Sequence, residues 1–165
     1  MTTQTIERTT LSNLVSNEEY CRKVLPFIKA DYFDVKEERV VFEEITNFVE
    51  KYKRIPTKIS LEIEVESRKD LTQDQHTKIV EIIQTLDATD VDMEWLVDTT
   101  EKFCKDKAIY NAIVDGISII DGKDKKRSAD AIPSILTDAL AVCFDNAVGH
   151  DYFDDAEERF EFYHK

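Results

Sequence analysis

Gly122 and Lys123 come nearest to a phosphate-binding pattern in this 165-residue chain. A phosphate loop needs closely spaced glycines whose backbone amides hold the phosphates, followed by Lys and then by Ser or Thr as a ligand of Mg²⁺. Here Asp124 stands where that hydroxyl belongs, Gly116 lies too far upstream, and residues 118–120 are typical of a helix. We therefore expect neither nucleotide binding nor catalysis by this chain, and no cofactor in it.

Adjacent carboxylates are the next candidates for chemistry, because general acid–base catalysis often uses two of them. Examples are Glu37 with Glu38, Glu43 with Glu44, and Glu157 with Glu158. Neighbouring residues on a helix diverge by about 100°, so the members of a pair cannot converge on one substrate. We expect these pairs on solvated faces. We expect Asp151, Asp154 and Asp155 to complement the positive end of the helix dipole at the start of a final helix, and not to bind a metal ion.

The cysteines and histidines show no pattern of a metal or redox site. Cys21, Cys104 and Cys143 are odd in number and include no C-x-x-C spacing, so we predict that they are reduced and buried. His76, His150 and His164 lie at helical spacing neither from one another nor from a cysteine. The sequence therefore predicts no metal site.

The charge excludes one class of partner. The chain has 22 basic and 35 acidic residues, a formal net charge of −13, and such a surface repels the phosphate backbone of a nucleic acid. We expect no direct contact with DNA or RNA. The basic cluster Lys123, Lys125, Lys126 and Arg127 falls between two predicted helices, where it is typical of a solvated turn. No apolar run is long enough for a membrane span or a signal peptide, so a cytoplasmic protein is expected.

The composition indicates an all-α fold. Only three glycines and three prolines occur, which leaves little material for tight turns, and 42% of the residues are hydrophobic, enough for one domain with a core. We expect a small N-terminal helical globule over residues 1–90, an antiparallel helical hairpin over 91–146, and a C-terminal helix over 147–165.

Besides residues 57–67, four helices are predicted in the globule. Two short ones cover about residues 5–15 and 18–25. A third begins at an Asp34 N-cap with Glu37 three residues later, and its apolar face holds Val41, Ile45, Phe48 and Tyr52. The last follows the capping-box spacing of Thr72 and Gln75 and ends near Asp87.

Residues 57–67 are ambiguous. Ile59, Leu61, Ile63 and Val65 alternate with polar residues, which is the period of a strand. No other segment offers a pairing partner, and an isolated strand leaves its backbone donors unpaired. We therefore predict a helix capped by Thr57, just after Pro56.

The hairpin carries more apolar surface than two helices can cover. On the long helix, about residues 91–120, one stripe holds Ile109, Ile113, Ile117 and Ile120, and a neighbouring face holds Phe103, Tyr110 and Val114. The returning helix, about 132–144, offers Ile135, Leu136, Ala139, Leu140 and Cys143 for one of these faces. The other face is covered either by a second copy of the chain, which predicts self-association, or by the short N-terminal helices. The pattern leaves both open.

The final helix has an apolar face and no stop signal. Phe153, Ala156, Phe160 and Tyr163 share one face, and no glycine, asparagine or proline precedes the end at Lys165. This pattern leads us to expect a chain that continues.

Several segments carry a resemblance to a known family. They are "LSNLVSNEEYCRKVLPFIKADYF", "VFEEI", "RIPT", "WLVDTTEKFCKDKAIYNAI" and "AIPSILTDALAVCFDNAVGHDYFDDAEERFEFY". Together they resemble the N-terminal region of phage DnaB-like replicative DNA helicases, from about Thr10 onward. The resemblance implies a non-catalytic collar on a hexameric ring, often a trimer of dimers, that recruits primase and in some systems a helicase loader in the host cytoplasm.

The resemblance also implies roles for residues. The subunit contact would involve Ile109, Ile113, Ile117, Ile120, Ile135, Leu136 and Leu140. Residues 147–165 would be a linker helix that docks on a neighbouring motor domain through Phe153, Phe160 and Tyr163. ATP and Mg²⁺ would belong to that ATPase domain, which is absent from this chain.

Two other classes of function compete with this reading. An acidic phage protein that mimics DNA, or inhibits a nucleic-acid-binding enzyme, would also be small and strongly negative. Its binding would be sensitive to salt, whereas an apolar subunit contact would hardly respond to salt. A metal-dependent hydrolase is a more distant alternative, which an absence of bound metal in the purified protein would dispose of.

Overall fold

The computed structural model describes residues 5–144, and these fold into helices with no strand among them. The α-helices are α1 (Ile6–Leu14), α2 (Glu18–Val24), α3 (Lys36–Tyr52), α4 (Lys58–Glu66), α5 (Gln73–Gln84), α6 (Met93–Ile120) and α7 (Ile132–Leu140). Short 3-10 turns occupy Leu25–Phe27, Ala30–Tyr32 and Ala129–Ala131. The predicted all-α class is confirmed.

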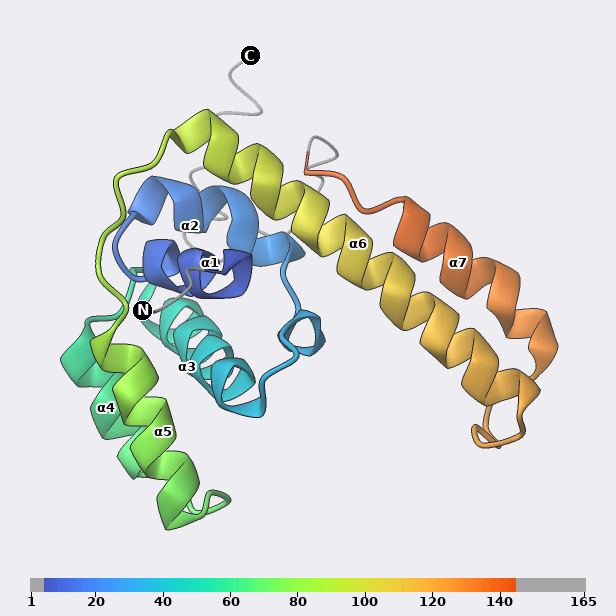
Figure 1. Ribbon diagram of the computed structural model, residues 1–165, viewed down its shortest axis with the longest axis horizontal. Coiled ribbons are helices and arrows are strands. Elements are labelled where there is room, and N and C mark those ends of the chain that lie inside the picture. The colour runs from blue at the N-terminus through green and yellow to red at the C-terminus, as the bar shows by residue number, and fades with distance from the viewer. Residues whose placement is uncertain (1–4, 145–165) are drawn as a thin grey trace.

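The helices form a globule with a projecting arm (Figure 1). Helices α1, α2 and α3 pack together under the first half of α6, while α4 and α5 lie side by side against α3 at the far end of the globule. The second half of α6 extends beyond the globule, and α7 returns along it in the opposite direction. Within residues 5–144, no helix is both long and apolar enough to cross a lipid bilayer.

Side-chain caps explain where most of these helices begin. Thr5, Asn17, Thr57, Thr72 and Asp92 each accept a hydrogen bond from the backbone N–H three residues later. Such a cap satisfies one of the backbone donors that the first helical turn leaves free. Thr72 and Gln75 complete the predicted capping box, because the Gln75 side chain also accepts from the Thr72 N–H at 2.9 Å.

The ambiguous segment is a helix, as predicted. The Thr57 hydroxyl accepts from the Ser60 N–H at 3.1 Å, and the Ser60 hydroxyl oxygen accepts from the Thr57 N–H at 2.9 Å. Leu61 and Val65, four residues apart, are fully buried against the globule. The alternation of apolar and polar residues therefore reflects two apolar sides of one short helix.

The predicted start of α3 is wrong in detail. Val35 is the N-cap, and its apolar side chain makes no capping bond. The Asp34 carboxylate, predicted as the cap, instead accepts a hydrogen bond from Lys107 Nζ of α6 at 2.5 Å. The buried face is also rotated from the predicted one, since it includes Phe42 and Val49. Tyr52 is 43% exposed.

Two predicted helix ends are also too late. Helix α5 stops at Gln84 and not near Asp87, and α7 stops at Leu140 and not at Phe144. Ala141 ends α7 with a backbone N–H that is shared among three carbonyls of the last turn. Phe144 is still held close to the fold, because its N–H donates to the Glu101 carboxylate at 2.8 Å.

Two carboxylates predicted on solvated faces are buried instead. Glu38 is 4% exposed and accepts from Arg8 Nε at 3.1 Å. Glu44 is 8% exposed and lies 3.4 Å from the Arg68 guanidinium, while burial raises the pKa of its carboxyl against the opposing effect of Arg68. A charged group is buried when a partner compensates for its lost hydration, so the arginines explain the error.

The cysteines are free thiols. Cys21 and Cys104 are buried as predicted, and burial raises the pKa of each thiol to about 12. Cys143 is only half-buried, which corrects its predicted burial. The two buried thiols therefore serve as small apolar core groups.

Candidate assembly surface on the helical arm

The first half of α6 belongs to the core of the globule. Leu96, Thr100 and Cys104 are buried, and the Thr100 hydroxyl lies 2.6 Å from the Tyr20 hydroxyl in a buried hydrogen bond. The Phe103 ring meets the Tyr32 ring edge-on with 6.5 Å between centroids. The N-terminal segments thus cover Phe103 but not Tyr110 or Val114 of the same predicted face, so the alternative in which they cover that face holds only for its first residue.

Small residues let α7 approach the second half of α6 closely. Ala112 and Gly116 of α6 are buried, and so is Ala139 of α7. A Cβ atom at Gly116 would lie 3.7 Å from Ile132 Cγ2. Ala112 and Gly116 are four residues apart and so lie on one face of α6, where a second helix can pack against both.

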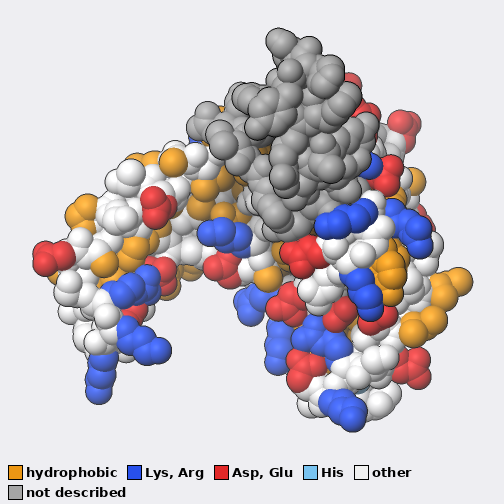
Figure 2. Space-filling view, turned by 180° about the vertical axis from the view of Figure 1, so that it is seen from behind, with side chains coloured by type: hydrophobic (Ala, Val, Ile, Leu, Met, Phe, Trp, Pro, Cys, Tyr) orange, Lys and Arg blue, Asp and Glu red, His pale blue; other side chains and the backbone are white. Residues whose placement is uncertain are grey.

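The adjacent face of α6 remains uncovered in the part of the chain that the structure describes. We call this the arm face, and its exposed members are Tyr110 (61%), Ile113 (50%), Val114 (43%), Ile117 (53%) and Ile120 (73%). They recur at i, i+3, i+4, i+7 and i+10, which places them on one side of the helix. Figure 2 shows hydrophobic side chains gathered over the arm.

Helix α7 adds to this face from its outer side. Leu140 is 65% exposed, and Leu136, one turn earlier, is half-buried. Ile109 of α6 is also half-buried. Six of the seven residues predicted for a subunit contact therefore lie on or beside the arm face, together with Tyr110 and Val114, which that prediction did not include.

Ile135 lies elsewhere. It lines a cavity of about 220 Å³ between the arm and the globule, together with Tyr32, Lys29 and Ala139. Leu136 and Leu140 are turned away from this cavity, because they do not line it and Leu140 is exposed. The structure thus places Ile135 on the inner side of the arm, where a second chain would not meet the same face.

The charges of the arm lie at its end and beside its face. At the tip, Arg127 folds back on Asp124 with 2.7 Å between guanidinium nitrogen and carboxylate oxygen, and this contact helps to hold the pKa of the Asp124 carboxyl below its usual value. Lys123, Lys125 and Lys126 are exposed in the same turn, as expected for a solvated loop. Near the globule, Lys102 and Asp106 form an exposed pair at 2.9 Å. The arm face itself is uncharged.

The predicted linker-helix residues Phe153, Phe160 and Tyr163 lie outside the described residues, as do Asp151, Asp154 and Asp155. Within residues 5–144, no group of three or more His, Cys, Asp or Glu side chains could hold a metal ion. The arrangement that the structure does present is an apolar face on a helical arm. Such exposed apolar surface is characteristic of protein–protein contact sites.

The fold and this surface define a helical domain whose arm has an apolar face left uncovered by the rest of residues 5–144. No protein-family model matches the chain. The DnaB-like replicative helicase of Enterobacteria phage T4 is 32% identical to it over 157 residues, which cover 90% of this chain and 33% of that protein. The chain thus spans about a third of the length of this relative. The predicted resemblance to a phage DnaB-like replicative helicase is confirmed over this stretch.

Proposed function

We propose that this chain is the non-catalytic N-terminal collar of a hexameric replicative DNA helicase. Its similarity to about a third of such a helicase supports a role as one part of a larger machine. In this proposal the ATP and Mg²⁺ chemistry belongs to a motor domain outside this sequence. The chain contributes assembly, as a dimer or a trimer of dimers, and the recruitment of primase or a helicase loader during DNA replication.

The arm face is the observation that carries this proposal. Helix α7 packs on Ala112, Gly116 and Ile119 of α6, and so leaves Ile113, Ile117 and Ile120 without a partner in the described chain. A two-fold axis across this face would bring the same apolar residues of two chains together, as closed symmetric dimers require. Each isoleucine buried in such a contact contributes about 1–3 kcal/mol, and the sum over both chains is set against an association cost of about 4–15 kcal/mol.

Sedimentation equilibrium of the chain and of its Ile113→Glu variant tests this proposal. Ile113 is half-exposed, so the carboxylate is tolerated in the isolated chain but would be buried without a partner in the dimer. We expect a dimer or higher oligomer that resists 1 M salt and dissociates in the variant. Val91→Glu adds the same charge at an exposed apolar residue before α6 and should leave assembly intact.

Two results would contradict the proposal. A chain that stays monomeric at high concentration would mean that the arm face does not support self-association by itself. A chain that binds nucleic-acid-binding proteins in a salt-sensitive manner, while Ile113→Glu changes nothing, would favour the DNA-mimic alternative that the −13 charge suggests.

A further inference from the structure

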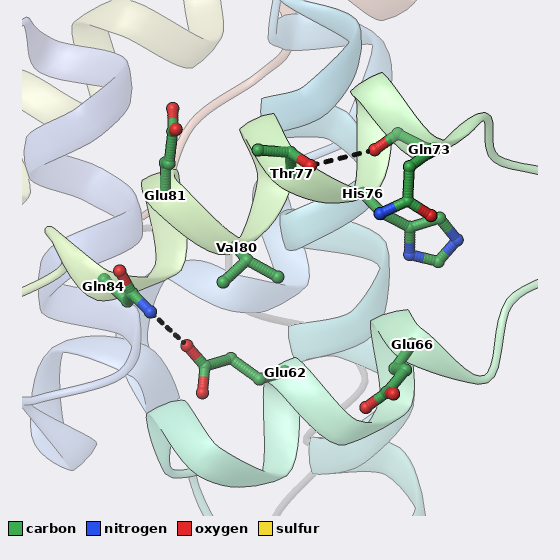
Figure 3. Close-up of a pocket in the computed structure, with 8 residues that line it drawn as sticks. All are labelled: Glu62, Glu66, Gln73, His76, Thr77, Val80, Glu81 and Gln84. Atoms are coloured by element: carbon green, nitrogen blue, oxygen red, sulfur yellow. Dashed lines mark hydrogen bonds between the residues drawn. The ribbon is translucent and has the colours of Figure 1, made fainter.

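A second open surface lies at the opposite end of the molecule, between α4 and α5. A groove of about 560 Å³ is lined by Glu62, Glu66, Gln73, His76, Thr77, Val80, Glu81 and Gln84 (Figure 3). The Gln84 amide donates to the Glu62 carboxylate across the groove at 3.2 Å and ties the two helices together at one end. The groove therefore lies between two helices that this hydrogen bond links.

Helix α4 presents an apolar pair on the same side. Ile59 and Ile63 are 68% and 56% exposed, and with Glu62 and Glu66 they follow the spacing i, i+3, i+4 and i+7. This spacing puts all four on one face of the helix. The opposite face of α4 is the buried one, so Ile59 and Ile63 remain exposed within residues 5–144.

The carboxylates of the groove lack basic partners in the described part of the chain. No ion pair there involves Glu62, Glu66 or Glu81. Lys58, the basic residue at the start of α4, instead pairs with Asp87 and donates to the Gln84 carbonyl at 3.1 Å. The groove therefore combines three negative charges with an exposed apolar stripe.

We infer that this groove, together with Ile59 and Ile63 on the same face of α4 as Glu62 and Glu66, binds a basic amphipathic helix of another protein. Apolar residues of the incoming helix would cover Ile59, Ile63 and Val80, while Lys or Arg on its flanks would pair with the glutamates. Helix-in-groove recognition uses this arrangement of apolar anchors one turn apart. Complementary charge would add association rate and selectivity.

The chemistry of the groove excludes other occupants. Its carboxylates repel the phosphates of nucleic acids and of anionic lipid surfaces. A second copy of this chain offers a poor match in charge, because each copy carries a formal net charge of −13. A basic helix satisfies both the charge and the apolar stripe.

This inference rests on the recruitment part of the proposed function and is independent of self-assembly through the arm. The probe is an 18-residue synthetic helix with leucines along one face and lysines on its flanks, and the control is a scrambled peptide of the same composition. Fluorescence anisotropy with the full chain should show at least about tenfold tighter binding of the amphipathic peptide, which corresponds to about 1.4 kcal/mol. The Ile113→Glu variant should bind it equally well, so a failure of assembly does not affect this measurement.

Two groove variants separate the apolar and the charged contributions. Ile59→Ser combined with Ile63→Ser, and Glu62→Gln combined with Glu66→Gln, should each weaken binding about tenfold, and only the second should remove most of the salt dependence. Glu50→Gln with Glu94→Gln removes two exposed carboxylates elsewhere and should change little. Circular dichroism verifies that each variant is folded.

Three outcomes would overturn the inference. Equal affinity for the amphipathic and scrambled peptides, or an equal loss in the Glu50/Glu94 control, would show general attraction to an acidic surface. Loss of self-association in the Ile59/Ile63 variant would show that a second copy occupies the groove.

Discussion

The close approach of α7 to α6 predicts opposite effects of alanine at two glycines of the arm. Gly116 lies in the interior of α6, and an added Cβ would meet Ile132 Cγ2 at 3.7 Å, an ordinary contact distance. Gly122 follows α6 with φ of +77°, where an added Cβ meets nothing within 4 Å. Gly116→Ala should therefore stabilise the protein, and Gly122→Ala should destabilise it.

The size of each effect follows from the local geometry. Alanine is favoured over glycine in a helix interior by about 0.8–1.0 kcal/mol, and a buried methyl group contributes up to about 0.8 kcal/mol more, so Gly116→Ala should gain about 1–2 kcal/mol. A side chain in the left-handed region costs about 1–2 kcal/mol, which sets the loss for Gly122→Ala. At roughly 2–4 °C per kcal/mol, the two variants should differ in Tm by about 4–16 °C.

Thermal unfolding at one fixed protein concentration measures both variants, preferably in the Ile113→Glu background so that assembly does not contribute. Gly116→Leu is the matched control, because the space beside Ile132 accepts a methyl group and not a larger side chain; overpacking should cost about 1–3 kcal/mol. A destabilising Gly116→Ala would refute the reasoning, since it would mean that α6 and α7 pack more closely than 3.7 Å allows. A neutral Gly122→Ala would mean that the turn does not require the left-handed conformation.

Three further predictions concern the globule. Burial raises the pKa of Tyr20 to about 12, so the protonated phenol contributes about 3 kcal/mol to the free energy of unfolding below pH 10, and this contribution is lost as the pH rises through 12. In alkaline unfolding followed by circular dichroism, Tyr20→Phe should lack this part of the pH dependence. Ellman's reagent should modify Cys143 rapidly in the native protein, and Cys21 and Cys104 only on unfolding; rapid reaction of all three thiols would contradict the buried positions of two of them. Thr57→Ala removes a capping-box partner of α4 and should lower the free energy of unfolding by about 1 kcal/mol in urea titrations, whereas an unchanged midpoint would show that packing alone holds this helix.

The helices were predictable where local chemistry determines them. Thr57 and Thr72 predict the starts of α4 and α5, because an N-cap involves only residues up to three positions away. The structure contains both caps. For α4 this local signal outweighs the strand-like alternation of its side chains, because a single strand would leave its backbone unpaired. Caps and backbone satisfaction are short-range properties, so one sequence suffices to read them.

Errors arose where a distant residue decides the outcome. Asp34 fits the local pattern of a cap, but Lys107, far along the chain, takes its carboxylate. The local pattern predicts that Glu38 and Glu44 are solvated, but ion pairs with Arg8 and Arg68 allow both carboxylates to be buried. Each error reflects a charge pair between segments far apart in sequence, which spacing along one helix does not reveal.

The side of α6 that α7 covers was equally beyond the sequence pattern. The isoleucine stripe and the row of small residues Ala112 and Gly116 both have helical spacing, and hydrophobicity alone favours covering the isoleucines. In the structure α7 packs against the small residues, because they permit a close approach of the two backbones.

This choice has a functional consequence. A hairpin that buried Ile113, Ile117 and Ile120 would leave no apolar face on the arm for another chain to contact. Packing of α7 on Gly116 instead leaves these larger apolar side chains exposed. Helix α4, at the opposite end of the molecule, likewise has one buried and one exposed apolar side. Leu61 and Val65 pack in the core, while Ile59 and Ile63 remain exposed. Uncharged isoleucines on the arm suit an identical chain, because identical charges would repel across a two-fold axis, whereas isoleucines mixed with glutamates on α4 suit a different, basic partner. Assembly and recruitment would then use separate surfaces, so that a partner could bind without competing with subunit contacts.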